Sequence, residues 1–148
     1  MFGFQKNTQQ VDEEVQDEFI ERVNSAAEAF LAAVPGTSAL DYSIESVAAL
    51  DAVLEEAHQG RLTLTPMQTV GAAAYLYEVG RRHFGGLYEV CDDEDPVVLV
   101  TGEPEFDVCL CAISKVERRV RNGAADTLPA FFQHYVRAVN ARASDTIR

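Results

Sequence analysis

The chain has 148 residues, a formal net charge of −12, and a composition that is 47% hydrophobic and 24% charged. This length suits a single domain, which at this size buries enough surface to fold without a disulfide or a metal ion. The composition excludes a disordered, collagen-like or disulfide-dense protein. The net negative charge argues against binding to nucleic acid and to anionic membrane surfaces.

The charge is distributed unevenly along the chain. Residues 1–60 carry 12 acidic and two basic side chains, whereas residues 112–148 carry three acidic and seven basic ones. One interpretation is that the basic part packs beside the acidic part and partly neutralises it. The alternative is a basic face for an acidic partner or for nucleic acid, and its side chains would be Lys115, Arg118, Arg119 and Arg121.

Cysteine usage and hydropathy bear on the compartment. The chain has three cysteines, Cys91, Cys109 and Cys111, and an odd number is typical of reduced thiols. The first residues are too polar for a secretory signal, and no apolar stretch reaches the ~20 residues of a membrane span. We therefore expect a cytoplasmic protein without membrane association.

Residues 1–10 are predicted to be a flexible tail, and residues 11–148 a single domain. Apolar residues spaced by three or four predict a helix over 11–33, which Pro35 and Gly36 end.

Two further helices follow. One is expected at 44–58, with the Ser43 hydroxyl accepting a hydrogen bond from the amide of Ser46. The other is expected at 66–84, because Thr65-Pro66-Met67-Gln68 has a capping box with proline at the first helical position. Its middle is apolar nearly all round, which is typical of a buried helix.

The periodicity then changes to short extended runs at 87–91, 97–101 and 106–111, separated by turn residues. These runs predict a three-stranded antiparallel meander. Helices at about 112–122 and 127–142 complete the chain. The fold class is therefore expected to be α+β, with N-terminal helices, a small sheet and C-terminal helices.

The sequence holds none of the common nucleotide-binding, zinc-protease or serine-hydrolase motifs. Thiols at i and i+2, as in Cys109 and Cys111, share one face of a strand, but a zinc or copper(I) site would also need Cys91 and a histidine. The acidic turn 92–95 lacks the spacing of a calcium loop and is interpreted as a solvated hairpin turn. We expect no metal and no cofactor.

The three histidines are interpreted as surface or packing residues: His58, His83 and His134.

The strongest candidate site lies at the end of the buried helix. Tyr75, Glu78 and Arg82 share one helical face, and Glu78 has the spacing to pair with Arg82. Charged groups beside a buried turn need partners, and Asp41 is the expected partner of Arg81 or Arg82. The site is predicted to be either a structural ion-pair network or a polar cleft that recognises a carboxylate or phosphate. Its residues are Asp41, Tyr42, Tyr75, Glu78, Arg81 and Arg82.

Two patterns carry a resemblance to a known group of proteins. Leu40-Asp41-Tyr42-Ser43, with Ser46 and Leu50-Asp51, is the first, and Tyr75 to Gly86 with Glu78, Arg81 and Arg82 is the second. Together they resemble bacterial domains of unknown function over about residues 38–105. The resemblance implies that Asp41, Glu78, Arg81 and Arg82 lie together, and it implies no activity.

These observations favour a non-catalytic domain that binds a protein or a small ligand, with a protein partner or a second copy of the chain as expected partners. The alternative is a small enzyme in which Asp41, Tyr75, Glu78 and Arg82 perform acid–base chemistry. No catalytic residue is assigned from the sequence.

Overall fold

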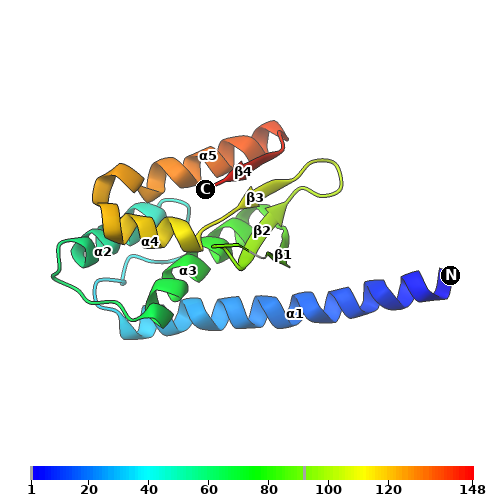
Figure 1. Ribbon diagram of the computed structural model, residues 1–148, viewed down its shortest axis with the longest axis horizontal. Helices are drawn as coiled ribbons and strands as arrows, with labels where there is room; N and C mark the ends of the chain where they lie inside the picture. The colour runs from blue at the N-terminus through cyan, green and yellow to red at the C-terminus, as the bar shows by residue number, and fades with distance from the viewer. Residues whose placement is uncertain (1, 92) are drawn as a thin grey trace.

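A computed structural model describes residues 2–91 and 93–148, and the side chains from Glu13 onward within those ranges. It confirms the α+β class, with a four-stranded sheet among its helices (Figure 1). In chain order the elements are α1 (Phe2–Ala33), α2 (Ser46–His58), α3 (Pro66–Phe84), β1 (Leu87–Val90), β2 (Val97–Thr101), β3 (Val108–Leu110), α4 (Ile113–Asn122), the 3-10 turn η1 (Gly123–Asp126), α5 (Leu128–Ala141) and β4 (Asp145–Ile147).

Helix α1 is longer than expected. It begins at Phe2, so residues 2–10, expected as a tail, continue the helix, and its N-terminal end projects beyond the other elements (Figure 1). The apolar stripe marks only where a helix packs, and residues 4–10 contain no proline or glycine to interrupt it. Further along, the Gln16 side chain hydrogen-bonds to both the amide and the carbonyl of Tyr88, which occupies these groups at the edge of β1.

The sheet has the order β1-β2-β3-β4. The first three strands pair antiparallel as predicted, but β4 lies parallel to β3, so the expectation of a three-stranded, purely antiparallel sheet was wrong. A strand of only three residues has no readable period. It pairs because α5 returns the chain to the free edge of β3, where the Cys111 amide donates to the Ile147 carbonyl.

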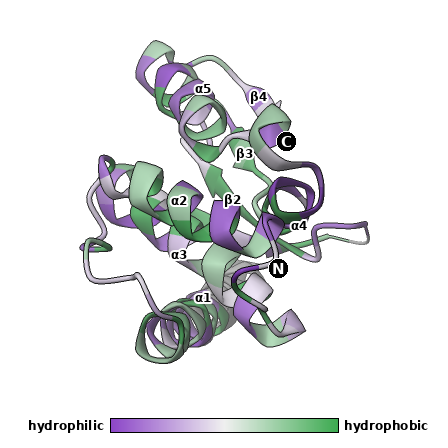
Figure 2. Ribbon diagram, turned by 90° about the vertical axis from the view of Figure 1, so that its left-hand side faces the viewer, coloured by the Kyte–Doolittle hydropathy of each residue, from purple (hydrophilic) through white to green (hydrophobic). Residues whose placement is uncertain are grey.

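The two faces of the sheet have different surroundings. Tyr88, Leu99, Leu110 and Ile147 lie opposite one another across the strands and belong to the main core, which α3 and α5 complete. Figure 2 shows β2 and β3, largely green, between α5 and α3. The other face carries a separate, smaller cluster, whose members are Val98, Val100 and Cys111, with Cys91 and Cys109 packed against them.

The hydrogen bonds predicted before α2 and at the start of α3 are present, although only the start of α3 lies where it was expected. Thr65 and Gln68 form the reciprocal capping box of α3, and the Ser46 amide donates to the Ser43 hydroxyl at 3.1 Å. Helix α2 itself begins at Ser46, two residues later than expected, because residues 43–45 form a tighter turn that precedes the helix.

Gly80 lies where α3 meets the sheet and α5. A β-carbon there would approach Leu99 Cδ2 to 3.0 Å and the Tyr135 hydroxyl to 3.1 Å. We expect Gly80→Leu to lower the free energy of unfolding by about 1–3 kcal/mol, because the leucine side chain overpacks the contact with the sheet and α5. Urea unfolding followed by circular dichroism measures the change. A midpoint equal to that of the parent chain would contradict this prediction.

Candidate functional site

Glu78 is the centre of the site predicted from the sequence. Its side chain is fully buried, and Arg81 donates to both carboxylate oxygens at 2.8 and 3.0 Å. Arg82 donates at 3.2 Å and also contacts Asn24, and the Tyr88 hydroxyl donates at 2.8 Å. Burial raises the pKa of Glu78, but the hydrogen bonds from Arg81 and Tyr88 outweigh it, so the net pKa lies below its usual value.

Tyr42 joins this network through an unusual backbone. Its φ of 65° is left-handed, which is rare for a bulky residue. Contacts on all sides hold it: the amide donates to the Tyr75 hydroxyl at 2.8 Å, the hydroxyl donates to Glu28, and the His83 ring nitrogen lies 3.0 Å from the carbonyl. The Tyr42 ring stacks on Tyr75 and has the Arg82 guanidinium 3.6 Å above its centre.

Asp41 stands apart from the other five predicted residues. It is exposed, and its carboxylate accepts from the amide and the hydroxyl of Ser43, which lowers its pKa. In the described part of the chain it forms no ion pair with Arg81 or Arg82, contrary to the expectation. Both arginines pair with Glu78 instead, because Glu78 lies three and four residues before them on the same helix and is therefore close to both.

The contacts correspond to a structural network rather than to an acid–base site. Glu78 already accepts four hydrogen bonds, and the Tyr75 hydroxyl is engaged with the Tyr42 amide and with Ser46 Oγ at 2.6 Å. A carboxylate with a lowered pKa and filled acceptor positions is poorly suited to take up a proton. These contacts tie α1 and the loop before α2 to α3.

A second buried network was not predicted. Arg119 of α4 is 2% exposed. It donates two hydrogen bonds to Asp51 of α2, at 2.8 and 3.2 Å, and forms an ion pair with Glu55 at 3.0 Å. Asp51 also accepts from the Leu128 amide and so caps α5. The signal was present in the sequence: Asp51 follows Val47 by four residues and therefore lies on the apolar face of its helix.

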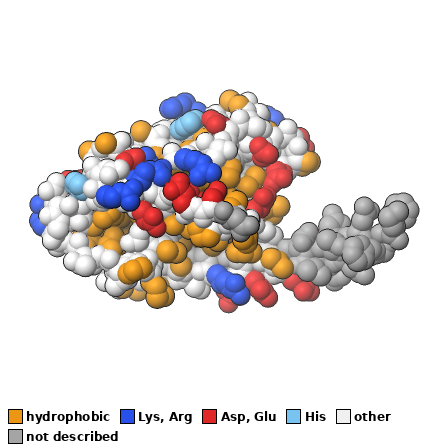
Figure 3. Space-filling view, in the orientation of Figure 1, with side chains coloured by type: hydrophobic (Ala, Val, Ile, Leu, Met, Phe, Trp, Pro, Cys, Tyr) orange, Lys and Arg blue, Asp and Glu red, His pale blue; other side chains and the backbone are white. Residues whose placement is uncertain are grey.

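The basic segment of α4 is largely neutralised within the chain. Lys115 and Arg118 both pair with Asp126, and Arg119 is buried as described. Of the four residues expected in a basic face, Arg121 is the exposed one without an ion pair among the described residues. Figure 3 shows blue and red side chains intermixed on this face. Arg119 therefore fits the first interpretation, in which the basic part packs beside the acidic part, whereas Lys115 and Arg118 pair with an acidic residue of their own segment.

The acidic turn has a structural role at one position. Asp95 is fully buried, and its carboxylate accepts from the amide and the hydroxyl of Ser114, at the start of α4. Asp92 lies outside the described residues.

The ring of each histidine contacts an oxygen atom. His58 contacts the Val120 carbonyl, His83 contacts the Tyr42 carbonyl, and His134 contacts the Asp145 carboxylate. Among the described residues no group of three or more His, Cys, Asp or Glu side chains has the geometry of a metal site.

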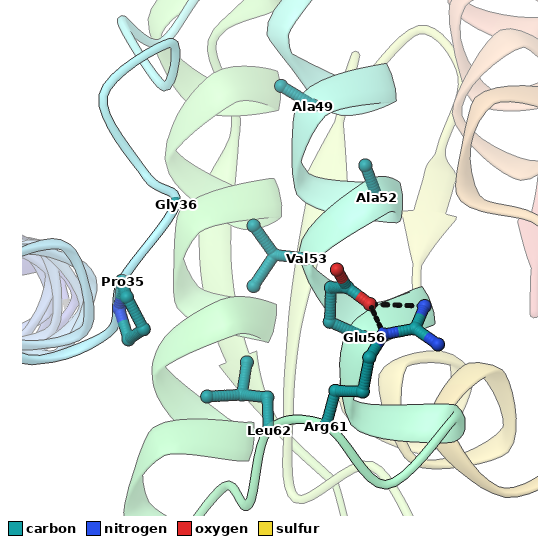
Figure 4. A pocket seen from close by; sticks show the side chains of 8 residues that line it. All are labelled: Pro35, Gly36, Ala49, Ala52, Val53, Glu56, Arg61 and Leu62. Carbon is teal, nitrogen blue, oxygen red and sulfur yellow. Dashed lines mark hydrogen bonds and ion pairs between the residues drawn. The ribbon is translucent and has the colours of Figure 1, made fainter.

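An open pocket lies along α2, and the core residue Val53 forms part of its wall. Its volume is about 440 Å³, and it is bounded by the segment after α1, by α2 and by the segment after α2 (Figure 4). Apolar side chains form most of the wall, and the Glu56–Arg61 ion pair lies at one end. The lining residues are Pro35, Gly36, Ala49, Ala52, Val53, Glu56, Arg61 and Leu62. One signal in the sequence was not used: the small residues Ala49 and Ala52 of α2.

Glu89 provides a test of pH dependence. A hydrogen bond shared with Glu103, together with partial desolvation, raises the pKa of Glu89 to about 6 from a usual 4.5. Its stabilising contribution is therefore full below pH 4.5 and is lost as the pH rises through 6. We expect Glu89→Gln to raise the melting temperature at pH 8 and to leave it nearly unchanged at pH 4.5. The gain stays below about 1 kcal/mol, since the side chain is exposed.

Thermal melts at pH 4.5, 6 and 8 measure this effect, with exposed Glu105→Gln as the matched control. A gain from Glu89→Gln that is equal at all three pH values, or that matches the gain from the control, would contradict the shared proton.

No helix among the described residues is both long enough and apolar enough to cross a membrane. Comparison of the chain with protein-family models, with curated proteins and with solved structures gives no match, so the resemblance to bacterial domains of unknown function stays a prediction.

Proposed function

We propose that this protein is a non-catalytic domain that binds a small amphipathic ligand in the pocket beside α2. The observation that carries the proposal is the pocket itself, an open concavity with an apolar wall and one ion pair at its end. Its volume of about 440 Å³ falls within the range usual for small-molecule sites. The Glu78 network, by contrast, is closed on itself and offers its polar atoms to neighbouring side chains.

The chemistry of the wall defines the class of ligand. Val53 and Leu62 present apolar surface, and Ala49 and Ala52 leave room because their side chains are short. The Glu56–Arg61 pair is about half exposed, so either group can exchange a water contact for a polar group of the ligand. A ligand with an apolar body and one polar end fits this arrangement. The odd number of cysteines supports a reducing compartment, the cytoplasm, as the place of binding.

The turn after α2 positions the Glu56–Arg61 ion pair at the end of the pocket. The amides of Arg61 and Leu62 both donate to the Glu56 carbonyl, and Gly60 adopts a φ of 78° that lets the chain reverse there. Because Glu56 and Arg61 come from the two sides of this turn, their ion pair is positioned by the backbone before any ligand binds.

Anilinonaphthalene sulfonate, which has an aromatic body and one sulfonate, is a suitable probe. NMR titration of the full chain should shift the methyl signals of Ala49, Ala52, Val53 and Leu62. Ala52→Phe should abolish these shifts by filling the pocket, whereas Ala29→Phe, at an exposed position of α1, should preserve them. Shifts confined to other parts of the chain, or shifts that persist in Ala52→Phe, would overturn the proposal.

A further inference from the structure

Three cysteines gather on the face of the sheet away from the main core. Cys109 lies on β3, Cys111 follows that strand, and Cys91 follows β1, and all three belong to the small cluster around Val98 and Val100. The Cys109 and Cys111 sulfurs are 3.8 Å apart. Neither the ion-pair networks nor the proposed pocket uses these thiols.

We propose that Cys109 and Cys111 form a redox-reactive dithiol that closes to a disulfide when a hydroperoxide oxidises it. This inference is independent of the proposed ligand pocket. It rests on the proximity of the two sulfurs, on their common face of the sheet, and on the different exposure of the two side chains.

Closing the bond requires a local shift of the strand backbone, which strains the disulfide and makes it easy to reverse. Residues i and i+2 of a strand have α-carbons roughly 6.6 Å apart, from a rise of about 3.3 Å per residue. Disulfides span up to about 6.8 Å between α-carbons, so this pair lies near the upper limit. A bond formed near that limit is strained, and strained disulfides are the ones that cellular thiols reduce readily.

The surroundings assign different roles to the two sulfurs. Cys109 is partly exposed, whereas Cys111 is 1% exposed, so a peroxide reaches Cys109 first. The hydrogen bond between the thiols lowers the pKa of Cys109, against the opposing effects of burial, Cys91 and Glu89, and raises that of Cys111, so Cys109 is the more readily ionised of the two. The Arg148 guanidinium, held by Asp93 and Asp95, adds a favourable positive charge.

The reaction has two balanced steps. The Cys109 thiolate attacks one oxygen of hydrogen peroxide, the O–O bond breaks, and the departing hydroxide takes a proton from solvent to become water. Cys109 is then a sulfenic acid. The Cys111 sulfur attacks the Cys109 sulfur, the S–O bond breaks, and the hydroxyl leaves as water with the proton of the Cys111 thiol. Two thiols are oxidised to one disulfide, and one peroxide is reduced to two waters.

Peptide mapping of the full chain tests the proposal. The protein is treated with one equivalent of hydrogen peroxide, alkylated, and digested with a protease that cleaves before aspartate. This protease separates Cys91, in peptide 51–91, from Cys109 and Cys111, in peptide 107–125. We expect peptide 107–125 to lose two hydrogen atoms and to resist alkylation until it is reduced, while Cys91 remains alkylated.

Single variants provide the controls. Cys91→Ser should form the internal link as the parent does, whereas Cys109→Ser and Cys111→Ser should each lose it, with circular dichroism confirming that each variant is folded. A link between the two peptides, a sulfinic acid at Cys109 without a link, or full alkylation of Cys109 and Cys111 after peroxide would each overturn the proposal.

Discussion

Replacing Glu78 with alanine is expected to lower the free energy of unfolding by about 2–4 kcal/mol. The change leaves Arg81 and Arg82 without their carboxylate and the buried Tyr88 hydroxyl without its acceptor. The full cost of breaking a buried ion pair is about 3–5 kcal/mol, and it is reduced here because both guanidinium groups reach solvent in part. Urea unfolding at pH 7 measures the loss.

Two comparisons make this prediction specific. Glu78→Gln keeps the size of the side chain and removes its charge, and its deficit should shrink as the pH falls below about 4.5. The pKa of Glu78 is lowered on folding, so its stabilisation is present above the usual value of 4.5 and is lost on acidification. Glu21→Ala, at an exposed position of α1, should change stability by less than about 0.5 kcal/mol. A similar effect at both positions would contradict the role of the network.

The second large effect is expected for Asp51→Ala, with a loss of about 2–4 kcal/mol. Asp51 accepts two hydrogen bonds from Arg119, which is almost fully buried, and it also caps the first amide of α5. Removing it therefore weakens the connection among α2, α4 and α5 at one point. Chemical denaturation monitored by circular dichroism is the appropriate measurement.

Glu55→Ala is the matched control, because Glu55 contacts the same arginine but is 35% exposed and caps no helix. Its loss should be smaller by about 1 kcal/mol or more. Asp51→Asn, which keeps an oxygen for the Leu128 amide, should fall between the two. Equal losses for Asp51→Ala and Glu55→Ala would show that the cap on α5 contributes nothing measurable.

The two networks contain most of the charged and polar side chains that the sequence suggested as candidates for function. Arg81, Arg82 and Arg119 each bind carboxylates of the same chain. The pocket that we propose for a ligand is mostly apolar, and it lies beside α2 rather than at these charged groups.

Residues that lie close together in the sequence determine much of the structure of this protein. The capping box at Thr65, the buried middle of α3 and the two antiparallel pairings of β1, β2 and β3 all follow from residues near one another in the sequence. So does the pairing of Glu78 with Arg81 and Arg82, because a helix brings residues three and four apart together. Periodicity and short spacing are local properties, and one sequence shows them directly.

The tertiary structure decided what depends on distant residues. Strand β4 exists only because α5 delivers residues 145–147 to the edge of β3, and Asp51 meets Arg119 only because α2 and α4 pack together. Asp41, assigned to the network from its sequence pattern, instead contacts Ser43. The pocket beside α2 and the approach of the two thiols likewise depend on how the elements pack, which no local pattern of residues specifies.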